Sequence, residues 1–381
     1  MRVLFIGAPV DAVQGEGLSY QTKFERTGKN TGNLLIGCGL RREIAYTSYK
    51  YGTSQNMETI NQDFDLIAIP AANFIFKGFD FGYLADFIEA TTLPCLIVGL
   101  GAQLPSIDTQ EIDIPEGTKR FLKIVSERTV KIGVRGEFTA QVLAKMGIHN
   151  VTITGCPSLY WSLNPHVSIR KKDYSPYMRV SINGSRNVTG HSFSEEAAKK
   201  TESDLLKLSL QNKYDYVLQN EFPEIDILFT EGEISEAQRN DLVTLSKRFD
   251  LNLTPEHYTA YIRNFCKAFF SMEEWAEYIR TKDFSIGTRF HGNMVALQNG
   301  VPAVIIAHDS RTTEMARFMK IPHYPVDQCD LSNLEKIYNE ADFEAFASNY
   351  SRIYENYYNF LQENKVPNHL KDPISTSEAV A

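Results

Sequence analysis

Two segments of the sequence place an arginine where a predicted strand gives way to a predicted helix. They are Lys131-Ile-Gly-Val-Arg135-Gly-Glu-Phe-Thr and Phe284-Ser-Ile-Gly-Thr-Arg289-Phe-His291-Gly. Each arginine would lie at the carboxyl end of a parallel strand, beside the free N–H groups of a helix start. Open α/β sheets bind ligands there, and anions are favoured. Two such strand ends that face each other predict an anion-binding cleft between two domains.

A purely structural interpretation of these arginines stays open. Each could pair with a carboxylate while its glycine neighbour relaxes the turn, and this alternative weighs most for Arg135. A binding role is favoured for Arg289 because His291 follows two positions later. In an extended segment this spacing places both side chains on one side and turns Phe290 toward the core.

A third cation, Arg311, follows another predicted strand. Asp309 and Ser310 are good helix-capping residues, and they predict a capped amphipathic helix over 312–319. A cation in the first turn opposes the helix dipole. Arg311 is therefore expected to be either solvated or recruited to an anion.

Other candidate residues have weaker patterns. Cys156 and Ser158 follow a predicted strand at a turn toward the cleft. A packed thiol is favoured over a nucleophile for Cys156, because no flanking segment supplies an obvious base. Glu16 and Asn33, in the loop and helix after the first strand, could contact a second substrate.

Short apolar runs define the elements that would position these residues. Strands are expected over 2–7, 65–69, 95–99, 129–133 and 151–154, and again over 179–183, 215–219, 284–287 and 303–306. Helices are expected over 33–40, 82–90, 117–126 and 136–146, and then over 235–249, 271–281 and 312–319. Strand runs this apolar suit parallel strands covered on both faces, and the alternation predicts an α/β fold.

The length of 381 residues favours two domains. The polar, proline-bearing stretch 164–178 interrupts the alternation and is the candidate linker. We expect an N-terminal Rossmann-like domain over 1–168 and a C-terminal one over 178–340. A helical segment over 341–372 should cross the junction and pack back on the N-terminal domain.

Composition excludes several classes of protein. The net charge is −8 and no run of like charges occurs, so nothing predicts a nucleic-acid partner. The longest apolar stretches are shorter than the roughly 18 residues of a membrane span, and the chain opens in a strand pattern without a leader. The five cysteines are scattered and form no metal-binding spacing. A cytoplasmic protein without a bound metal is expected.

The motifs resemble those of a known family. The segment from Asp283 through Ala303, with His308-Asp-Ser-Arg311-Thr-Thr-Glu-Met-Ala, resembles the C-terminal signature of the polysaccharide pyruvyl transferase family. Gly133-Val-Arg-Gly-Glu-Phe-Thr with Thr154-Gly-Cys-Pro-Ser looks like its middle motif. The resemblance implies two domains facing across a cleft, similar to GT-B glycosyltransferases. It also implies transfer of pyruvate from phosphoenolpyruvate onto two sugar hydroxyls, giving a cyclic ketal and phosphate.

By this resemblance, Arg135 and Arg289 would bind phosphoenolpyruvate and His291 would be the essential histidine. Planar guanidinium groups suit both the carboxylate and the phosphate, and Arg311 could add a third. An unperturbed histidine titrates near working pH, which suits His291 for acid–base catalysis. Phosphoenolpyruvate would be a co-substrate, and no cofactor is expected.

The acceptor side is less defined. Glu16, Asn33 and Ser158 are candidate acceptor contacts, but Pro70-Ala-Ala-Asn73 replaces a Gly-rich turn of many family members. The acceptor would be a sugar or glycan, free or linked to a lipid or nucleotide, and a peripheral location where glycans are assembled would fit. Two alternatives stay open: a GT-B glycosyltransferase that uses a nucleotide sugar, and an inactive protein that binds sugar phosphates.

Overall fold

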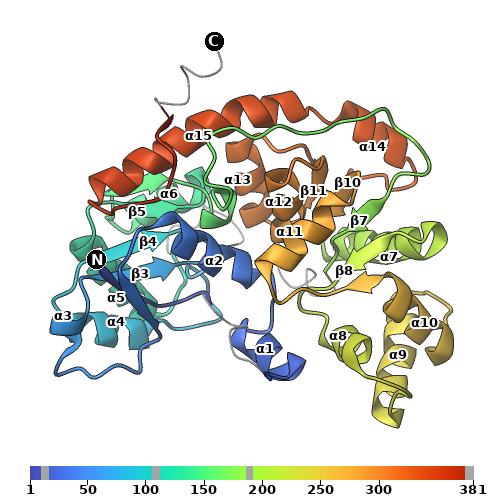
Figure 1. Ribbon diagram of the computed structural model, residues 1–381, viewed down its shortest axis with the longest axis horizontal. Coiled ribbons are helices and arrows are strands. Elements are labelled where there is room, and N and C mark those ends of the chain that lie inside the picture. Colours follow the sequence, from blue (N-terminus) through green and yellow to red (C-terminus); the bar gives the residue numbers. More distant parts are fainter. Residues whose placement is uncertain (10–16, 105–111, 186–191, 374–381) are drawn as a thin grey trace.

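The protein was analysed as a computed structural model, which describes residues 1–9, 17–104, 112–185 and 192–373. Two α/β units lie side by side, each built around a parallel sheet (Figure 1). A cavity lies between them, lined by residues of both. The expected α/β class, with two Rossmann-like units facing across a cleft in a GT-B-like arrangement, is confirmed.

The N-terminal unit contains a four-stranded sheet in the order β2-β1-β3-β4. Its strands are β1 (Arg2–Phe5), β2 (Ser48–Tyr51), β3 (Leu66–Pro70) and β4 (Cys95–Val98). A further parallel pair, β5 (Ile132–Val134) and β6 (Val151–Ile153), continues beyond β4. A parallel bridge between Leu100 and Val134 joins the pair to the segment after β4, so Arg135 follows a strand next to the main sheet.

The C-terminal unit contains a six-stranded sheet in the order β12-β11-β10-β7-β8-β9, in which every neighbouring pair is parallel. Its strands are β7 (Val180–Ile182), β8 (Asp215–Val217), β9 (Cys266–Lys267), β10 (Phe284–Gly287), β11 (Ala303–Ala307) and β12 (His323–Pro325). Gly287 ends β10 with φ +152°, and a Cβ there would lie 2.1 Å from the Asn183 carbonyl oxygen. Only glycine therefore permits the turn that leads to Arg289.

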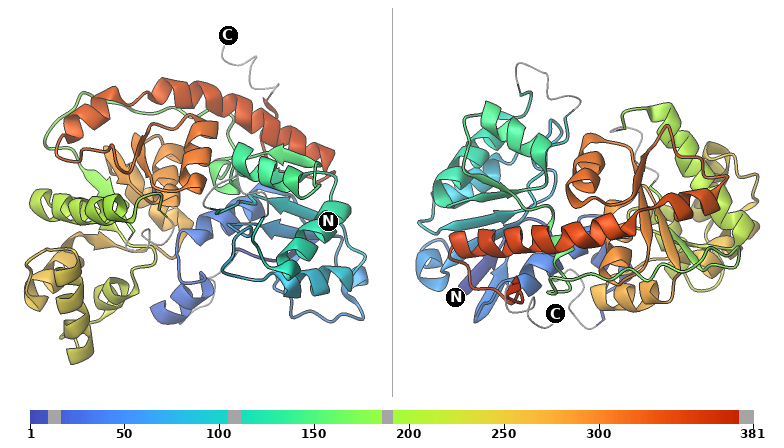
Figure 2. Two further views of the ribbon diagram at one scale, coloured as in Figure 1. Left: turned by 180° about the vertical axis from the view of Figure 1, so that it is seen from behind. Right: turned by 90° about the horizontal axis from the view of Figure 1, so that it is seen from above.

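Helices cover the faces of both sheets (Figures 1 and 2). In the N-terminal unit they are α1 (Tyr20–Arg26), α2 (Asn33–Glu43), α3 (Ile60–Asp63), α4 (Gly82–Glu89), α5 (Glu116–Arg128), α6 (Glu137–Lys145) and the 3-10 turn η1 (Pro157–Leu159). In the C-terminal unit they are α7 (Glu195–Asn212), α8 (Phe222–Phe229), α9 (Glu236–Arg248), α10 (Pro255–Phe265), α11 (Met272–Arg280), α12 (Phe290–Gln298), α13 (Ser310–Met319) and α14 (Leu334–Glu340). The last helix is α15 (Phe343–Glu363).

Helix α15 extends across both units (Figure 2). The Tyr357 hydroxyl donates to a carboxylate oxygen of buried Glu43 on α2 at 2.6 Å, and the Asn349 amide donates to the Phe318 carbonyl on α13 at 2.9 Å. Buried apolar residues from one face of the N-terminal sheet, from α15 and from the C-terminal unit belong to a single cluster. The two units thus share a continuous core, although the sequence length suggested separate ones.

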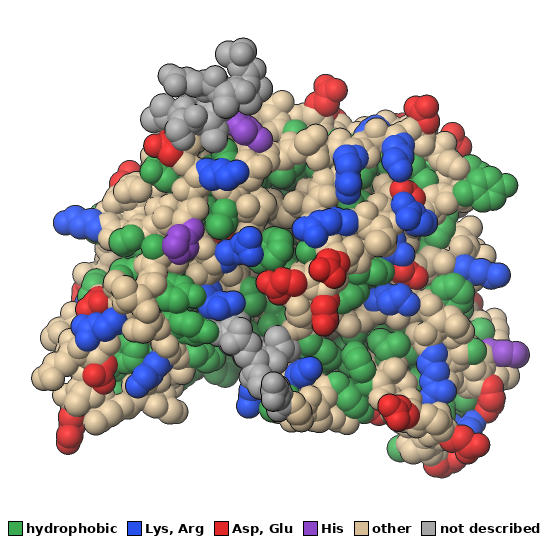
Figure 3. All heavy atoms as spheres, viewed as in Figure 1, with side chains coloured by type: hydrophobic (Ala, Val, Ile, Leu, Met, Phe, Trp, Pro, Cys, Tyr) green, Lys and Arg blue, Asp and Glu red, His purple; other side chains and the backbone are tan. Residues whose placement is uncertain are grey.

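The surface carries mixed charge. On the face drawn in Figure 3, basic and acidic side chains are interspersed. Within the described ranges, no helix has the length and apolar character needed to cross a membrane.

Candidate active site

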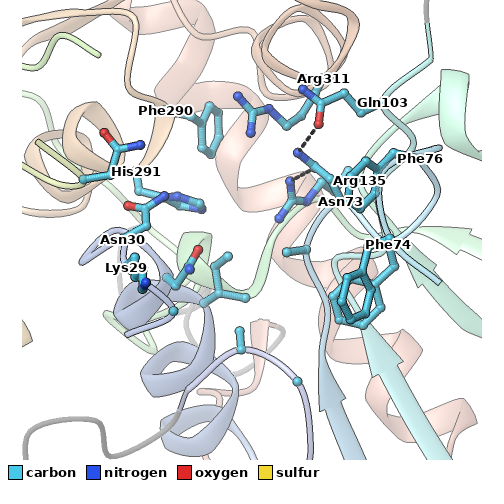
Figure 4. Close-up of a pocket in the computed structure, with 18 of the residues that line it drawn as sticks. Lys29, Asn30, Asn73, Phe74, Phe76, Gln103, Arg135, Phe290, His291 and Arg311 are labelled. Carbon is cyan, nitrogen blue, oxygen red and sulfur yellow. Dashed lines mark hydrogen bonds between the residues drawn. The ribbon is translucent and has the colours of Figure 1, made fainter. Parts of the chain in front are cut away.

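A cavity of about 810 Å³ lies between the two units. Its lining comes from loops that follow β1, β3, β4 and β5 in the N-terminal unit and β8, β10 and β11 in the C-terminal unit. These are the carboxyl ends of parallel strands, where open α/β sheets bind ligands. Arg135, Arg289, His291 and Arg311 all line this cavity, and Figure 4 shows His291, Arg135 and Arg311 around it.

Arg135 is almost completely buried, with 1% of its surface exposed. Its Nε donates to the Gly99 carbonyl at 2.8 Å and one terminal nitrogen donates to Asn73 Oδ1 at 2.6 Å, while Nη2 is buried without a hydrogen bond. Burial lowers the pKa of this guanidinium. No carboxylate within the described ranges forms an ion pair with Arg135, so the structural alternative considered for it does not hold there.

Arg289 does pair with a carboxylate. Its Nη2 donates to Glu221 Oε1 at 3.0 Å and to the Asn220 side chain, and Glu221 is fully buried. The Arg289 Nε is buried without a hydrogen bond. Arg289 is therefore held in place by an acidic partner but keeps donor capacity toward the cavity. From the sequence, pairing with a carboxylate had been considered mainly for Arg135, not for Arg289.

Asp309 contacts Arg311, the third arginine that lines the cavity. It is the N-cap of α13, accepting from the Thr312 N–H at 2.7 Å, as its position in the sequence predicted. Its other oxygen lies 3.3 Å from Arg311 Nη2 and 3.6 Å from His308 Nε2. Burial opposes ionisation of Asp309, but Arg311 and His308 lower its pKa to about 2. The Arg311 Nε remains buried without a partner.

His291 lies deep in the cleft, at the second position of α12. The expected extended segment from Arg289 to His291 is wrong, because α12 begins at Phe290 and Arg289 is its N-cap. Both side chains still line the cavity, because the N-cap and the first turn of α12 both lie at the carboxyl end of β10. The Nε2 of His291 lies 3.7 Å from Cys156 Sγ. The segments that flank Cys156 in the sequence offer it no base, and the C-terminal unit supplies this imidazole as its neighbour.

The pKa of His291 lies well below its ordinary value of 6.5, first because of burial and then because of Arg135, Arg311 and Arg289. The expectation that it titrates near neutral pH is therefore wrong for the free protein. Burial likewise lowers the pKa of His308 to about 4. Both imidazoles are therefore neutral at pH 7 in the free protein.

Residue Gly32, the N-cap of α2, packs against this histidine. A Cβ on Gly32 would lie 3.4 Å from His291 Nδ1 and 2.4 Å from Gln219 Oε1. The Thr31 N–H donates to the Gln219 carbonyl at 2.9 Å. The turn before α2 therefore lies against the cavity side of the C-terminal unit, and a side chain at position 32 would require the Gln219 side chain to move.

Polar contacts join the two units across the cavity. Asn73 donates to Gln103 Oε1 at 3.3 Å (Figure 4). Gln103 in turn donates to Asp309 Oδ2 at 3.5 Å. A further contact between the units involves Glu314 on α13, which accepts from the backbone N–H of Thr139 at 3.2 Å and from the Thr139 hydroxyl at 2.9 Å. Burial raises the pKa of Glu314 to about 7.

The candidate acceptor residues have different locations. Asn33 lines the cavity, and its amide donates to the Thr27 carbonyl at 3.0 Å. Ser158 does not line the cavity; it is fully buried in η1, against α2. The turn after β6 brings Cys156 against His291 but turns Ser158 into the core, which corrects the prediction that Ser158 contacts the acceptor. Glu16 lies outside the described residues.

Sequence analysis missed several residues that line the cavity. They are Asn73, Gln103, Gln219 and an aromatic set between β3 and α4. The aromatic set had a visible signal, because Phe and Tyr recur through the loop that replaces the expected Gly-rich turn. The three amide side chains had none, since isolated Asn and Gln residues are common in loops. No group of three or more His, Cys, Asp or Glu side chains suited to a metal ion occurs in the part of the chain that the structure describes.

The two α/β units bring three guanidinium groups to one cavity, and planar guanidinium groups are suited to oxyanions. The model of the family "polysaccharide pyruvyl transferase" matches residues 23–310, which is more than half of the chain. The protein therefore belongs to that family, and it is a transferase.

Solved structures of low sequence identity align along the whole chain. A putative UDP-N-acetylglucosamine 2-epimerase from Listeria monocytogenes is 12% identical, with TM-score 0.44, over 96% of this chain and 94% of that one. HepE from Anabaena, solved with UDP and glucose, is 12% identical, with TM-score 0.46, over 100% of both chains. No curated protein matches the sequence.

Proposed function

We propose that the protein transfers pyruvate from phosphoenolpyruvate to two hydroxyls of a sugar in a glycan or glycan precursor, forming a cyclic ketal and releasing phosphate. The observation that supports this most is the convergence of Arg135, Arg289 and Arg311 on one buried cavity, each with a guanidinium nitrogen that lacks a hydrogen bond. Unsatisfied buried donors are costly unless a ligand completes them. Phosphoenolpyruvate offers a carboxylate and a phosphate to do so.

The reaction needs two proton movements. The methylene carbon of phosphoenolpyruvate gains a proton and becomes the methyl group, and a sugar oxygen bonds to the neighbouring carbon. Phosphate then leaves as its bond to that carbon breaks, and the second sugar oxygen takes its place. The two hydroxyl protons that are lost balance the proton on the methyl carbon and the proton on the released phosphate.

His291 is the proposed proton carrier. In the free protein it is neutral, because burial and three arginines lower its pKa. Bound phosphoenolpyruvate brings roughly two to three negative charges next to those arginines, which raises the pKa of the imidazole. Binding thus prepares His291 to hold the proton that the methylene carbon receives, and the neutral ring can take one from an acceptor hydroxyl.

The test is phosphate release from phosphoenolpyruvate in the presence of a panel of galactosides, mannosides and N-acetylhexosaminides. Acceptor-dependent phosphate release, with a ketal product of the expected mass, supports the proposal. Release of a nucleoside diphosphate from a nucleotide sugar instead identifies a glycosyltransferase. Binding of phosphoenolpyruvate or a sugar phosphate without turnover across the panel identifies an inactive binding protein.

A further inference from the structure

The cavity has a second end that the arginines do not explain. It is formed by residues 73–83, the loop between β3 and α4 together with the first two residues of α4, which we call the aromatic loop. Its cavity-lining rings are Phe74, Phe76, Phe79, Phe81 and Tyr83. Figure 4 shows Phe74 and Phe76 on the side of the cavity away from His291. An aromatic set of this kind requires an explanation, because exposed apolar surface at a pocket is commonly a binding surface.

The rings form a connected layer rather than separate contacts. Phe74 and Phe81 stack with centroids 4.3 Å apart, and Phe79 packs edge-on against Phe81 at 4.8 Å. Phe74 and Phe81 are buried and support the layer, whereas Phe79 is 48% exposed and Tyr83 is 51% exposed. The aromatic loop thus presents two open ring surfaces on a rigid base.

The charged residues of the aromatic loop are engaged elsewhere. Lys77 pairs with Asp113 at 2.6 Å, and Asp80 accepts from the Gly82 N–H at 2.9 Å; neither lines the cavity. The uncharged amides of Asn73 and Gln103 border the rings instead. This end of the cavity therefore suits an uncharged ligand with both apolar and hydrogen-bonding surfaces, whereas the arginine end suits an anion.

We propose that the aromatic loop binds an uncharged pyranose ring of the acceptor by stacking. A pyranose has a face of C–H groups, which carry partial positive charge and are attracted to the negative face of an aromatic ring. Its hydroxyls extend from the ring edge, where amide side chains can bond them. The inference rests on the proposed function, since it names the second substrate of that reaction.

The position of Asn73 connects the two ends. Its side-chain oxygen accepts from Arg135 at 2.6 Å, and the next residue, Phe74, begins the aromatic layer. A sugar stacked on this layer thus lies in the same cavity as an anion held by Arg135. Attack of two neighbouring hydroxyls on a bound phosphoenolpyruvate requires both substrates in one cavity.

Direct binding measurements test the aromatic loop without relying on turnover. Wild type, Phe79→Ala, Tyr83→Ala and the double variant are titrated with methyl galactoside, mannoside and N-acetylglucosaminide, by calorimetry or ligand-observed NMR. Tyr177→Ala is the matched control, because Tyr177 is 91% exposed and does not line the cavity. Phe79 and Tyr83 are about half exposed and Tyr177 almost fully exposed, so the variants should fold.

We expect each single variant to bind the preferred glycoside about two- to tenfold more weakly, and the double variant more weakly still. Affinity for phosphoenolpyruvate should stay within about twofold, and Tyr177→Ala should match wild type. Unchanged glycoside affinity in the double variant contradicts the proposal. So does the absence of glycoside binding to wild type at millimolar concentration. UMP is titrated in parallel, and variants that lose affinity only for UMP would indicate a nucleobase site and also contradict the proposal.

Failure of the proposed function has a different signature. Wild type that binds both phosphoenolpyruvate and a glycoside but releases no phosphate contradicts ketal transfer. The aromatic loop would still be the sugar site if its variants lost glycoside affinity. Phosphate release that proceeds normally in the double variant, with an unchanged KM for the acceptor, supports the function and overturns the sugar site.

Discussion

The Sγ of Cys156 lies 3.7 Å from the Nε2 of His291, although 135 residues separate them in the sequence. Cys156 follows β6 of the N-terminal unit and His291 begins α12 of the C-terminal unit. The contact therefore exists only when the two units are docked. It places a fully buried sulfur against the proposed proton carrier.

Replacing Cys156 should distinguish a positioning role from a nucleophilic one. We expect Cys156→Ala to lower kcat by less than about tenfold, because only a weak hydrogen bond to the imidazole is lost. The KM for phosphoenolpyruvate should not change. A loss of more than about a thousandfold, with the fold retained, would instead make Cys156 a covalent catalyst. Steady-state kinetics measure kcat and KM, and circular dichroism checks that the variant keeps its fold.

Arg135 and Arg289 should both contribute to phosphoenolpyruvate binding. Arg135→Ala and Arg289→Ala are each expected to weaken binding about ten- to a hundredfold, the value of a charge-assisted hydrogen bond. Arg239→Ala serves as the control, since its ion pair with Glu256 is on the surface. Calorimetric titration measures the affinities. Wild-type affinity in both folded variants would show that the anion binds elsewhere.

Binding of phosphoenolpyruvate should take up protons at His291. Burial first, and then Arg135, Arg311 and Arg289, lower the pKa of the free imidazole, and Cys156 is its other close neighbour. An anion that offsets the arginines raises that pKa, so the bound state holds more protons and affinity rises as pH falls toward the new value. Calorimetry at pH 7 in two buffers of different ionisation enthalpy measures the uptake.

The control for this uptake is His291→Gln, which cannot titrate. It should bind phosphoenolpyruvate with less proton uptake than wild type and should turn over about 10²- to 10⁴-fold more slowly. Equal uptake in both proteins would assign the proton to another group, with Glu314 the nearest candidate on α13. Near-normal turnover would leave His291 as a hydrogen-bonding ligand only.

Glu314 should make stability depend on pH. Burial raises its pKa from 4.5 to about 7, so the folded state holds its proton more tightly than the unfolded state. The stabilising contribution is therefore complete below about pH 4.5 and is lost as pH rises through about 7. Urea unfolding at pH 5 and pH 8 should show a larger loss for wild type than for Glu314→Gln. An identical loss would contradict the prediction.

A methyl group on Gly32 should disturb the active site without unfolding the protein. The backbone of Gly32 has φ −60°, which alanine tolerates, but the added Cβ would meet Gln219 and His291. We expect Gly32→Ala to lower kcat about ten- to a hundredfold, as a small misplacement of a reacting group does. The melting temperature should change little. Full activity would show that the contact is not needed for catalysis.

Much of the fold follows from local sequence. Apolar runs identified β1, β3, β4, β10 and β11, because strands buried on both faces contain few polar residues. β2, with exposed Ser, Tyr and Lys side chains, gave no such signal, and it lies at the edge of its sheet. The polar helix α7 was missed for a similar reason, since charged side chains fill most of its outer face.

The sequence by itself determined that Arg135, Arg289 and Arg311 follow strands, that Asp309 caps a helix, and that the motifs belong to one family. Local backbone preferences and the common direction of parallel strands are enough for the first two results, whereas the family follows from the resemblance of the motifs. Only the tertiary structure decided that Cys156 and Gly32 contact His291, that Ser158 is buried away from the cavity, and that His291 is neutral in the free protein. Those properties depend on distances and burial across the two docked units, and no pattern within one segment encodes them.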